Sequence, residues 1–402
     1  MFVCNHCGKT YKREAFYKKH KCKNLKEKKD KIPSISMNIN DIKKLLAQKK
    51  EKLKNMNAIS LFSGMGGDSL GIHNSGMNLI AYSEIDPIFQ KTHSINFPNC
   101  KLIADGNILN TSDQDFEIYK GTVDLIFAGF PCQGFSHAGK KLPDDPRNTL
   151  FKEFLRATKI INPNYIIGEN VKGLLTKKTN DNKLYIDIIQ KEFENLGYKI
   201  YMKIMKCNLH GIPQNRQRLI IFGIKNTINH NFTFPPEREN NMDLKNIIQF
   251  SMDGAIKINK EDFNMNTIPN ECILTDLTND QIENNPHPNL KLLAKDKDYN
   301  YKNEIFPRRI HFGKRIPVGG EIIDIRKPIN TIICTYSRQP RFFIPLKNKN
   351  GFYLRCLLPV ELKQIQGFPK EYNINGDKNK QIIQIGNAVP PPLIEEVIKY
   401  MI

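Results

Sequence analysis

Residues 58–67 read AISLFSGMGG, an apolar run that leads directly into a glycine-rich turn. Such a run before glycines is typical of a buried β-strand that ends in a tight turn. Five similar runs follow, separated by helical patterns: Leu79–Ser83, Lys101–Ala104, Val123–Ala128, Tyr165–Gly168 and Leu219–Gly223. Strands that alternate with helices predict a parallel, doubly wound sheet of the α/β class.

Acidic residues follow three of these runs. Glu84 comes after the second strand, Asp105 after the third and Glu169 after the fifth. The carboxyl ends of strands in an open α/β sheet form the rim where ligands bind, so this succession favours a site there. The turn at 63–67 lacks the Lys-Ser/Thr ending of a phosphate-binding loop. This absence favours a nucleoside ligand without a chain of phosphates. Glu84 would then accept hydrogen bonds from ribose hydroxyls, and Asp105 would bind a purine amine.

The fourth strand continues into Gly129-Phe130-Pro131-Cys132-Gln133-Gly134. A thiol at a strand end can face a ligand, although a single cysteine is more often a small buried hydrophobe. The other cysteines after residue 57 are expected to be plain core or surface thiols.

Composition points to a nucleic-acid partner. The 402 residues carry a net charge of +20, and residues 1–56 contribute +12 of it. Such an excess favours a polyanion, although the abundant Lys, Asn and Ile are also what an AT-rich genome would produce. No apolar run approaches the ~18 residues of a membrane helix, and the N-terminus lacks a secretory signal. Nine scattered cysteines suit a reducing compartment, and we expect a cytoplasmic protein of a bacterium or of a virus-infected host cell.

Several motifs together carry a resemblance. They are Phe62-x-Gly64-x-Gly66, Pro131-Cys132-Gln133, Glu169-Asn170-Val171, Gln214-x-Arg216-x-Arg218 and Gly386-Asn387, with Arg147-x-x-Leu150-Phe151 and Glu361-x-x-x-x-Gln366-Gly367-Phe368-Pro369. In this order they resemble the motif set of the cytosine-C5 DNA methyltransferases. The resemblance covers residues 57–402 apart from an irregular middle, which varies in that family.

The resemblance implies a mechanism. Cys132 would add as a thiolate to C6 of cytosine, because C5 alone is a poor nucleophile. Glu169 would contact N3 and the exocyclic amine, while Arg218 would bind the base carbonyl oxygen or a nearby phosphate, with Arg216 supporting the loop. The methyl group would come from S-adenosylmethionine, and the target base would be flipped out of double-stranded DNA.

The same resemblance assigns a cofactor site. In the family, the aromatic residue at the position of Phe62 packs on the adenine ring, and Ile85 stands where a second adenine contact is expected. The expected cofactor-binding residues are Phe62, Ser63, Gly64, Gly66, Gly67, Glu84, Ile85, Asp105, Gly106, Pro131 and Asn387.

The N-terminus suggests a metal module. Cys4, Cys7 and His20 match three ligands of a ββα zinc finger, with Tyr11 and Tyr17 at its apolar positions. The fourth ligand would be Cys22, which follows His20 after one residue instead of three to five and would strain tetrahedral coordination. We expect Zn²⁺ at Cys4, Cys7, His20 and Cys22; the alternative is a basic tail with incidental cysteines.

The expected architecture is an S-adenosylmethionine-dependent, Rossmann-like α/β domain with a smaller irregular target-recognition domain. The predicted segments are a C2HC finger-like module (1–22), a basic and partly helical linker (23–56), the catalytic domain (57–225), the target-recognition domain (226–380) and a C-terminal helix that returns to the catalytic domain (381–402).

Other functions stay open at this stage. One alternative is a tRNA cytosine-C5 methyltransferase, which belongs to the same family. The Cys-Phe-Thr signature that is usual in the tRNA enzymes is absent from this sequence, and the most similar segment is Cys334-Thr335-Tyr336. A non-catalytic regulator or a zinc-finger protein with a secondary large domain would not need Cys132, Glu169 and Arg218 together. A monomer without membrane partner is expected, and a cognate restriction endonuclease is a further expected partner.

Overall fold

The computed structural model describes residues 2–3, 10–11, 39–131, 150–179, 181–238, 244–261, 263, 265–282, 310–314, 320–337 and 340–402. The chain divides into two compact units, Met1–Gln48 and Lys49–Ile402. In the first unit the short strands β1 (Phe2–Val3) and β2 (Thr10–Tyr11) pair antiparallel. Helix α2 (Ile39–Lys54) lies within the segment expected to be a partly helical linker.

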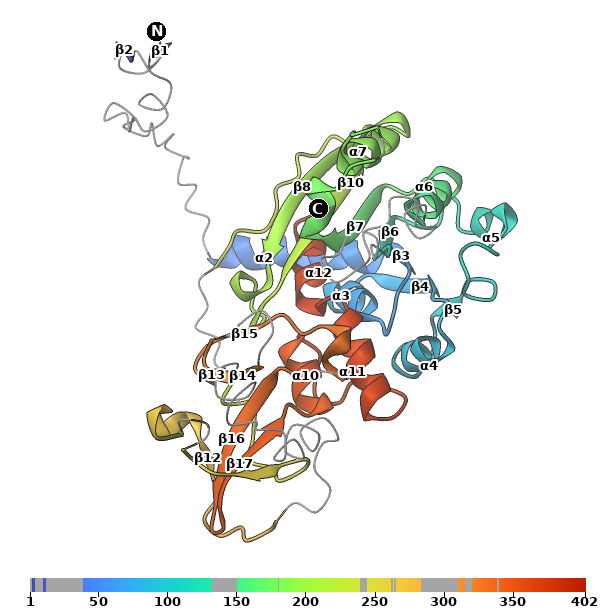
Figure 1. The fold of residues 1–402 in the computed structure, drawn as a ribbon. Coiled ribbons are helices and arrows are strands. Elements are labelled where there is room, and N and C mark those ends of the chain that lie inside the picture. Colours follow the sequence, from blue (N-terminus) through green and yellow to red (C-terminus); the bar gives the residue numbers. More distant parts are fainter. Residues whose placement is uncertain are drawn as a thin grey trace. The chain divides into compact units, whose positions relative to one another are not determined.

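The second unit is built around a seven-stranded sheet (Figure 1). All six runs expected to be strands are strands, and β3 pairs in parallel with both β4 and β6. The chain therefore winds outward in two directions from β3, and the ends of β3 and β6 mark the switch point where such sheets bind ligands. In spatial order the strands are β5 (Lys101–Leu102), β4 (Asn78–Ser83), β3 (Asn57–Leu61), β6 (Leu125–Ala128), β7 (Tyr165–Val171), β10 (Gln217–Lys225) and β8 (Tyr198–Lys206).

One expectation about this sheet is wrong, because it is not wholly parallel. Strand β10 runs antiparallel to both β7 and β8. β8 reaches β10 through only the short helix η3 (Cys207–Leu209) and β9 (Gln214–Asn215). A parallel neighbour needs a longer crossover, so the short connection dictates the reversed direction.

Helices cover both faces of the sheet, which confirms the doubly wound α/β class. On one face, apolar side chains of the strands pack on α5 (Asp113–Glu117), α6 (Leu150–Ile161) and α7 (Tyr185–Asn195). On the other face they pack on the end of α2 and on α12 (Pro391–Lys399), with Ile72 of α3 (Gly67–Ser75) in the same core. Successive residues of β7 and β10 alternate between these cores, as the pleat requires.

The two ends of the second unit's sequence meet at α3 and α12. A Cβ on Gly71 would come 2.8 Å from the Cβ of Ile394, so the helix backbones are closely packed. None of the described helices is long and apolar enough to span a membrane.

A second, smaller sheet is formed by residues of the segment expected to be the target-recognition domain (226–380). Its strands span two to seven residues, which explains why no strong pattern marks them in the sequence. Its core extends to helices α10 (Pro359–Ile365) and α11 (Lys378–Asn387) and to Phe97, at the end of α4 (Pro87–Asn96). The strand order is β11 (Ile256–Ile258), β17 (Gly351–Cys356), β16 (Phe342–Asn348), β14 (Gly320–Ile322) and β13 (Ile310–Phe312), with β12 (Leu274–Thr275) paired to β16.

Candidate active site

The glycine-rich turn after β3 has a backbone conformation that few residues adopt. Phe62 has a left-handed φ of 58°, and Gly64 and Gly66 have φ of 56° and 90°. A Cβ on Gly66 would come 2.8 Å from the Phe97 ring and from the hydroxyl oxygen of Tyr372. Left-handed backbone at a non-glycine residue stores roughly 1–2 kcal/mol, and such strain concentrates at functional sites. Phe62 is therefore held in an unfavourable conformation at the ligand-binding rim.

Glu84 fixes this turn from the neighbouring strand end. Its Oε2 accepts the Gly64 N–H at 2.8 Å, and its Oε1 accepts the Asp86 N–H at 2.9 Å. Burial raises the pKa of Glu84 above its ordinary value. Each carboxylate oxygen has two lone pairs, so the group can still accept hydrogen bonds from a ligand.

The loop after β5 presents Asp105. It begins with Ala104, a second non-glycine residue at positive φ (48°). Asp105 accepts hydrogen bonds from the Asn110 side chain at 2.7 Å and from the Asn107 N–H at 2.8 Å. These bonds, that of Asn110 first, lower the pKa of Asp105. Asp105 is therefore a charged acceptor at neutral pH.

The two acidic loops are joined to each other. Gln90 Nε2 donates to the carbonyl oxygens of Glu84 (2.6 Å) and Asp105 (3.3 Å). Gly106 (φ 88°) lies so close that a Cβ there would overlap both the Glu84 carbonyl oxygen and Gln90 Nε2. One nucleoside can thus meet Glu84 and Asp105 on loops that have a fixed spacing.

Two further side chains near this rim have features that a bound ligand would explain. Ser63 Oγ is buried and has no hydrogen-bond partner, and Ile85 is 66% exposed although it is a large aliphatic residue. A ligand with both a polar and a flat apolar part would satisfy the hydroxyl and cover Ile85 beside the half-buried Phe62. This donor and apolar set fits an adenosyl group with a polar tail.

On the other side of the switch point, charged side chains pair with each other. Glu169 lies within β7, which continues to Val171 instead of ending before Glu169. Its Oε1 is 2.7 Å from Nε of Arg218 on the adjacent strand β10. The two side chains are only 11% and 13% exposed, so this pair is largely shielded from water.

Asn170 links β7 to the strand end that precedes Cys132. Its side-chain amide donates to the Phe130 carbonyl oxygen at 3.2 Å. Gly129 is nearby, and a Cβ on it would lie 3.8 Å from the Phe62 carbonyl oxygen. Pro131 is half-buried and is the last described residue before Cys132, which itself lies outside the described residues together with Arg147. The described chain up to Pro131 therefore contacts the turn after β3 on one side and β7 on the other.

Arg216 is a buried anchor and does not face the rim. Its guanidinium donates to the carbonyl oxygens of Ile332 (2.9 Å) and Ala388 (3.0 Å). Burial and then the Arg218 charge lower the pKa of Arg216 to about 9, so it stays protonated at neutral pH. Arg216 supports the strand that carries Arg218, and we describe it as a positioning residue.

The motif glutamines complete this frame. Gln214 Nε2 donates to Gln366 Oε1 at 2.6 Å, and Gln366 Nε2 donates to the Ala388 carbonyl oxygen at 2.6 Å. A Cβ on Gly67 would overlap the carbonyl oxygen of Val389. Asn387, at the end of α11, is exposed next to this junction. The glycine-rich turn and the Arg216 segment thus meet the same stretch of chain.

Sequence reasoning gave no role to several residues of this site. Ala104 carries no sequence signal, because its strain is a property of the backbone alone. Gln90 sits on an ordinary amphipathic helix, and its two acceptors belong to different loops. Asn170 and Gln366 belong to motifs that carry the family resemblance, and this membership is the sequence signal that could have indicated their structural role.

The predicted metal ligands Cys4, Cys7, His20 and Cys22 lie outside the described residues, and zinc there stays a prediction. Within the described ranges no cluster of three or more His, Cys, Asp or Glu residues could hold a metal ion. The cysteines Cys100, Cys207, Cys272, Cys334 and Cys356 are free thiols.

Fold and rim together define a Rossmann-like methyltransferase. Solved structures with this fold include the methyltransferase EhMeth of Entamoeba histolytica, with a TM-score of 0.56 and 20% identity over 86% of this chain and 98% of that one. A mutant of Spodoptera frugiperda DNMT2 matches with a TM-score of 0.53 and 19% identity, covering 86% and 99% of the two chains.

The family is shown by sequence. The model of the C-5 cytosine-specific DNA methylases matches residues 56–402, and the chain belongs to this family. Similar proteins include the Type II methyltransferase M1.HphI of Haemophilus parahaemolyticus, 32% identical over 347 residues and 84% of each chain. Another is the Type II methyltransferase M.DdeI of Desulfomicrobium norvegicum, 31% identical over 373 residues, 85% of this chain and 87% of its own length. The protein is a DNA (cytosine-5-)-methyltransferase that uses S-adenosylmethionine.

Proposed function

We propose that cytosine is methylated between Cys132, Glu169 and Arg218. The observation that supports this most directly is the shielded Glu169–Arg218 pair at 2.7 Å, on the strand whose next residue, Asn170, holds the Phe130 carbonyl. Phe130 is two residues from Cys132, so one strand fixes both the charged pair and the backbone that leads to the thiol. A base flipped into this place would meet a nucleophile, a carboxylate and a guanidinium together.

The proposed chemistry uses each group once. The Cys132 thiolate forms a bond to C6, and the C5–C6 electron pair moves to C5. A proton shared between Glu169 and N3 would neutralise the negative charge that the ring gains, and the carboxylate would also accept from the exocyclic amine. Arg218 would bind the base carbonyl oxygen or a flanking phosphate. Transfer of the methyl group to C5 would release S-adenosylhomocysteine. Loss of the C5 proton to a base would then re-form the C5–C6 double bond and expel the Cys132 thiolate.

The opposite rim would hold the cofactor, which supplies the methyl group when bound. Glu84 would accept the ribose hydroxyls and Asp105 the adenine amine. Phe62 and Ile85 would enclose the adenine ring, and Ser63 would donate to the polar tail. The glycines at 64, 66, 67 and 106 would admit the ligand, with Pro131 and Asn387 at its reactive end.

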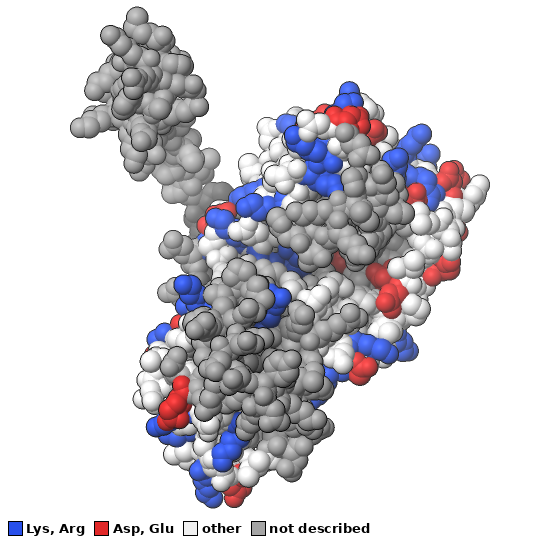
Figure 2. Space-filling view, in the orientation of Figure 1, with Lys and Arg blue, Asp and Glu red and all other residues white. Residues whose placement is uncertain are grey.

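The substrate would be double-stranded DNA, bound by a monomer in a salt-dependent manner. Lys and Arg side chains are spread over the face shown in Figure 2, in keeping with the net charge of +20. Contacts to phosphates release counterions, so affinity should fall as salt rises. Relatives are named Type II methyltransferases. We therefore propose site-specific modification that protects DNA from a cognate endonuclease.

The test follows label from S-adenosylmethionine into mixed-sequence duplex DNA or tRNA. Wild type should label DNA cytosine, and Cys132→Ser should lose the transfer. Cys100→Ser is the matched control, because burial raises the pKa of Cys100 to about 12 and this thiol cannot be the nucleophile. Equal transfer by Cys132→Ser, or label in tRNA alone, would overturn the proposal. Mapping the labelled positions gives the target site.

A second variant tests the carboxylate. Glu169→Gln keeps the shape of the side chain but cannot exchange a proton with N3, so kcat should fall by about 10²–10⁴-fold. Binding of S-adenosylmethionine should be unchanged, because Glu169 lies on the other side of the switch point. An unchanged kcat would remove Glu169 from the reaction.

A further inference from the structure

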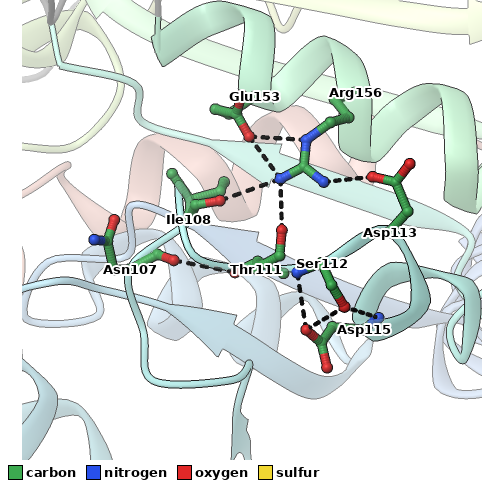
Figure 3. A network of polar contacts seen from close by, with 8 residues as sticks. All are labelled: Asn107, Ile108, Thr111, Ser112, Asp113, Asp115, Glu153 and Arg156. Atoms are coloured by element: carbon green, nitrogen blue, oxygen red, sulfur yellow. Dashed lines mark hydrogen bonds and ion pairs between the residues drawn. The ribbon is translucent and has the colours of Figure 1, made fainter.

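Arg156 of helix α6 is bonded to the loop that follows Asp105. One of its terminal nitrogens donates to the carbonyl oxygens of Thr111 (2.8 Å) and Ile108 (3.2 Å), as Figure 3 shows. These two carbonyls belong to the same loop as Asp105 but lie at its far end. A single side chain from another element thus determines where that end of the loop lies.

The guanidinium is itself held on two sides. Glu153 Oε2 accepts from Nε at 2.9 Å and from a terminal nitrogen at 2.7 Å. Asp113 accepts from the other terminal nitrogen at 2.6 Å, and the Phe116 ring lies under the guanidinium carbon at 5.0 Å. Hydrogen bonds with ionised partners are stronger than neutral ones, so the donor geometry is well defined. Only 28% of the Arg156 side chain is exposed.

The far end of the loop has one other restraint, the buried Ile108 side chain, which lies in the same apolar core as α6. The near end is held by the Gln90 amide and by the strained Ala104, whereas the N–H groups of Asn110 and Thr111 donate to the Asn107 carbonyl within the loop. Beyond it, Ser112 begins α5 with a reciprocal capping box to Asp115. Apolar packing does not fix the directions of the loop carbonyls, and among the described residues Arg156 supplies the hydrogen bonds from α6 that do.

We propose that Arg156 is a positioning residue for the adenosyl end of S-adenosylmethionine: it holds the loop from Asp105 to Thr111 at the spacing that the ligand needs. This inference rests on the proposed function, in which Asp105 binds the adenine amine. Arg156 touches neither ligand nor reacting atoms, and its effect passes through the Ile108 and Thr111 carbonyls.

The interaction requires arginine, because the guanidinium group is planar and its N–H donors point in fixed directions. Two carbonyls and two carboxylates surround the group from different directions, and five N–H donors can serve all of them. A lysine at 156 would keep the charge and could pair with Glu153, but its single ammonium cannot reach this set of acceptors. Arg156→Lys is therefore expected to behave like Arg156→Ala toward the cofactor.

The experiment measures the dissociation constant of S-adenosylmethionine by titration calorimetry on the folded full chain. Arg156→Lys and Arg156→Ala should each bind about tenfold more weakly. Lys159→Ala is the matched control, because Lys159 is an exposed cation on the same helix and the change keeps every bond from Arg156 to the loop. Its affinity should stay within about twofold of wild type. At saturating cofactor, kcat of all three should match wild type, so the defect appears in KM.

Hydrogen exchange without ligand gives a second readout. Amides of residues 105–112 should exchange faster in Arg156→Lys than in Lys159→Ala, while the strands keep their protection. Unchanged affinity and unchanged loop exchange in Arg156→Lys would overturn the inference.

Asp105→Ala separates the two proposals. If it weakens binding and Arg156→Lys does not, only the inference about Arg156 fails; if Asp105→Ala binds normally, the proposed adenine contact itself fails.

Discussion

The two halves of the large sheet hold their functional groups in different ways. On the β3–β4–β5 side, the acidic residues are fixed by local backbone: Glu84 accepts N–H groups of Gly64 and Asp86. On the β7–β10 side, Glu169 pairs with another side chain, and the supporting Arg216 reaches carbonyls 116 and 172 residues away. In the cofactor half the acidic residues are therefore held mainly by the backbone of their own loops, with Arg156 as the longer-range contact, whereas the base half depends on tertiary contacts throughout.

The largest effect expected from this contrast concerns the two arginines. Arg216→Ala should lower the free energy of unfolding by about 3–5 kcal/mol, because it removes a fully buried side chain and leaves the Ile332 carbonyl without its side-chain donor, whereas the Ala388 carbonyl keeps the bond from Gln366. Arg218→Ala should lower it by about 1–2 kcal/mol, since Glu169 retains some access to water. Denaturant unfolding of both variants measures the difference.

Activity should follow the opposite order once folding is accounted for. Under conditions in which both variants are folded, Arg218→Ala should lose more kcat than Arg216→Ala. Equal losses of stability, or a folded Arg216→Ala with the larger loss of kcat, would show that the two arginines do not divide support and chemistry in this way.

The same contrast explains what the sequence could predict. Apolar runs mark strands, and the residue after a strand must lie at the rim, so Glu84 and Asp105 could be found from local pattern. Glycines that precede a helix also indicate a close approach without further information. The cofactor half was therefore accessible to residue-by-residue reasoning, although the strain at Ala104 was not.

The base half resisted such reasoning for physical reasons. β8 is an edge strand whose alternating polar residues give no continuous apolar run, and without it the reversal of β10 could not be foreseen. The partners of Arg216 are backbone carbonyls of distant segments, which have no signature in residue type. Cys132, Glu169 and Arg218 could be named through family resemblance, but the Glu169–Arg218 pairing distance could not.

A pH-dependent effect on stability is expected in the cofactor half. Asp68 lies buried in α3 beneath the glycine-rich turn and accepts a hydrogen bond from the Ser60 hydroxyl. Burial raises its pKa from 3.8 to about 7. Between these values the folded protein holds a proton that the unfolded chain has lost, so stability from this group is present below pH 4 and is lost as the pH rises to 7.

Asp68→Asn removes this titration. Its stability relative to wild type should rise by about 2–3 kcal/mol between pH 5 and pH 7, since each pH unit below the folded-state pKa contributes about 1.4 kcal/mol. Chemical denaturation at both pH values measures the change. A constant difference between Asp68→Asn and wild type would mean that Asp68 is already ionised in the folded protein at pH 5.

The smallest expected effect separates close approach from backbone strain. Gly106 and Gly121 both have positive φ, 88° and 75°, but nothing lies within 4 Å of a Cβ on Gly121, whereas one on Gly106 would overlap the Glu84 carbonyl. Both alanine variants share the strain of left-handed backbone, so the difference between their stabilities measures the effect of the overlap.

Gly106→Ala should be less stable than Gly121→Ala by about 2 kcal/mol and should bind S-adenosylmethionine more weakly. Gly121→Ala should bind it like wild type. Since the overlap pushes Glu84 and Asp105 apart, equal affinities would mean that the spacing of these two loops does not determine cofactor binding.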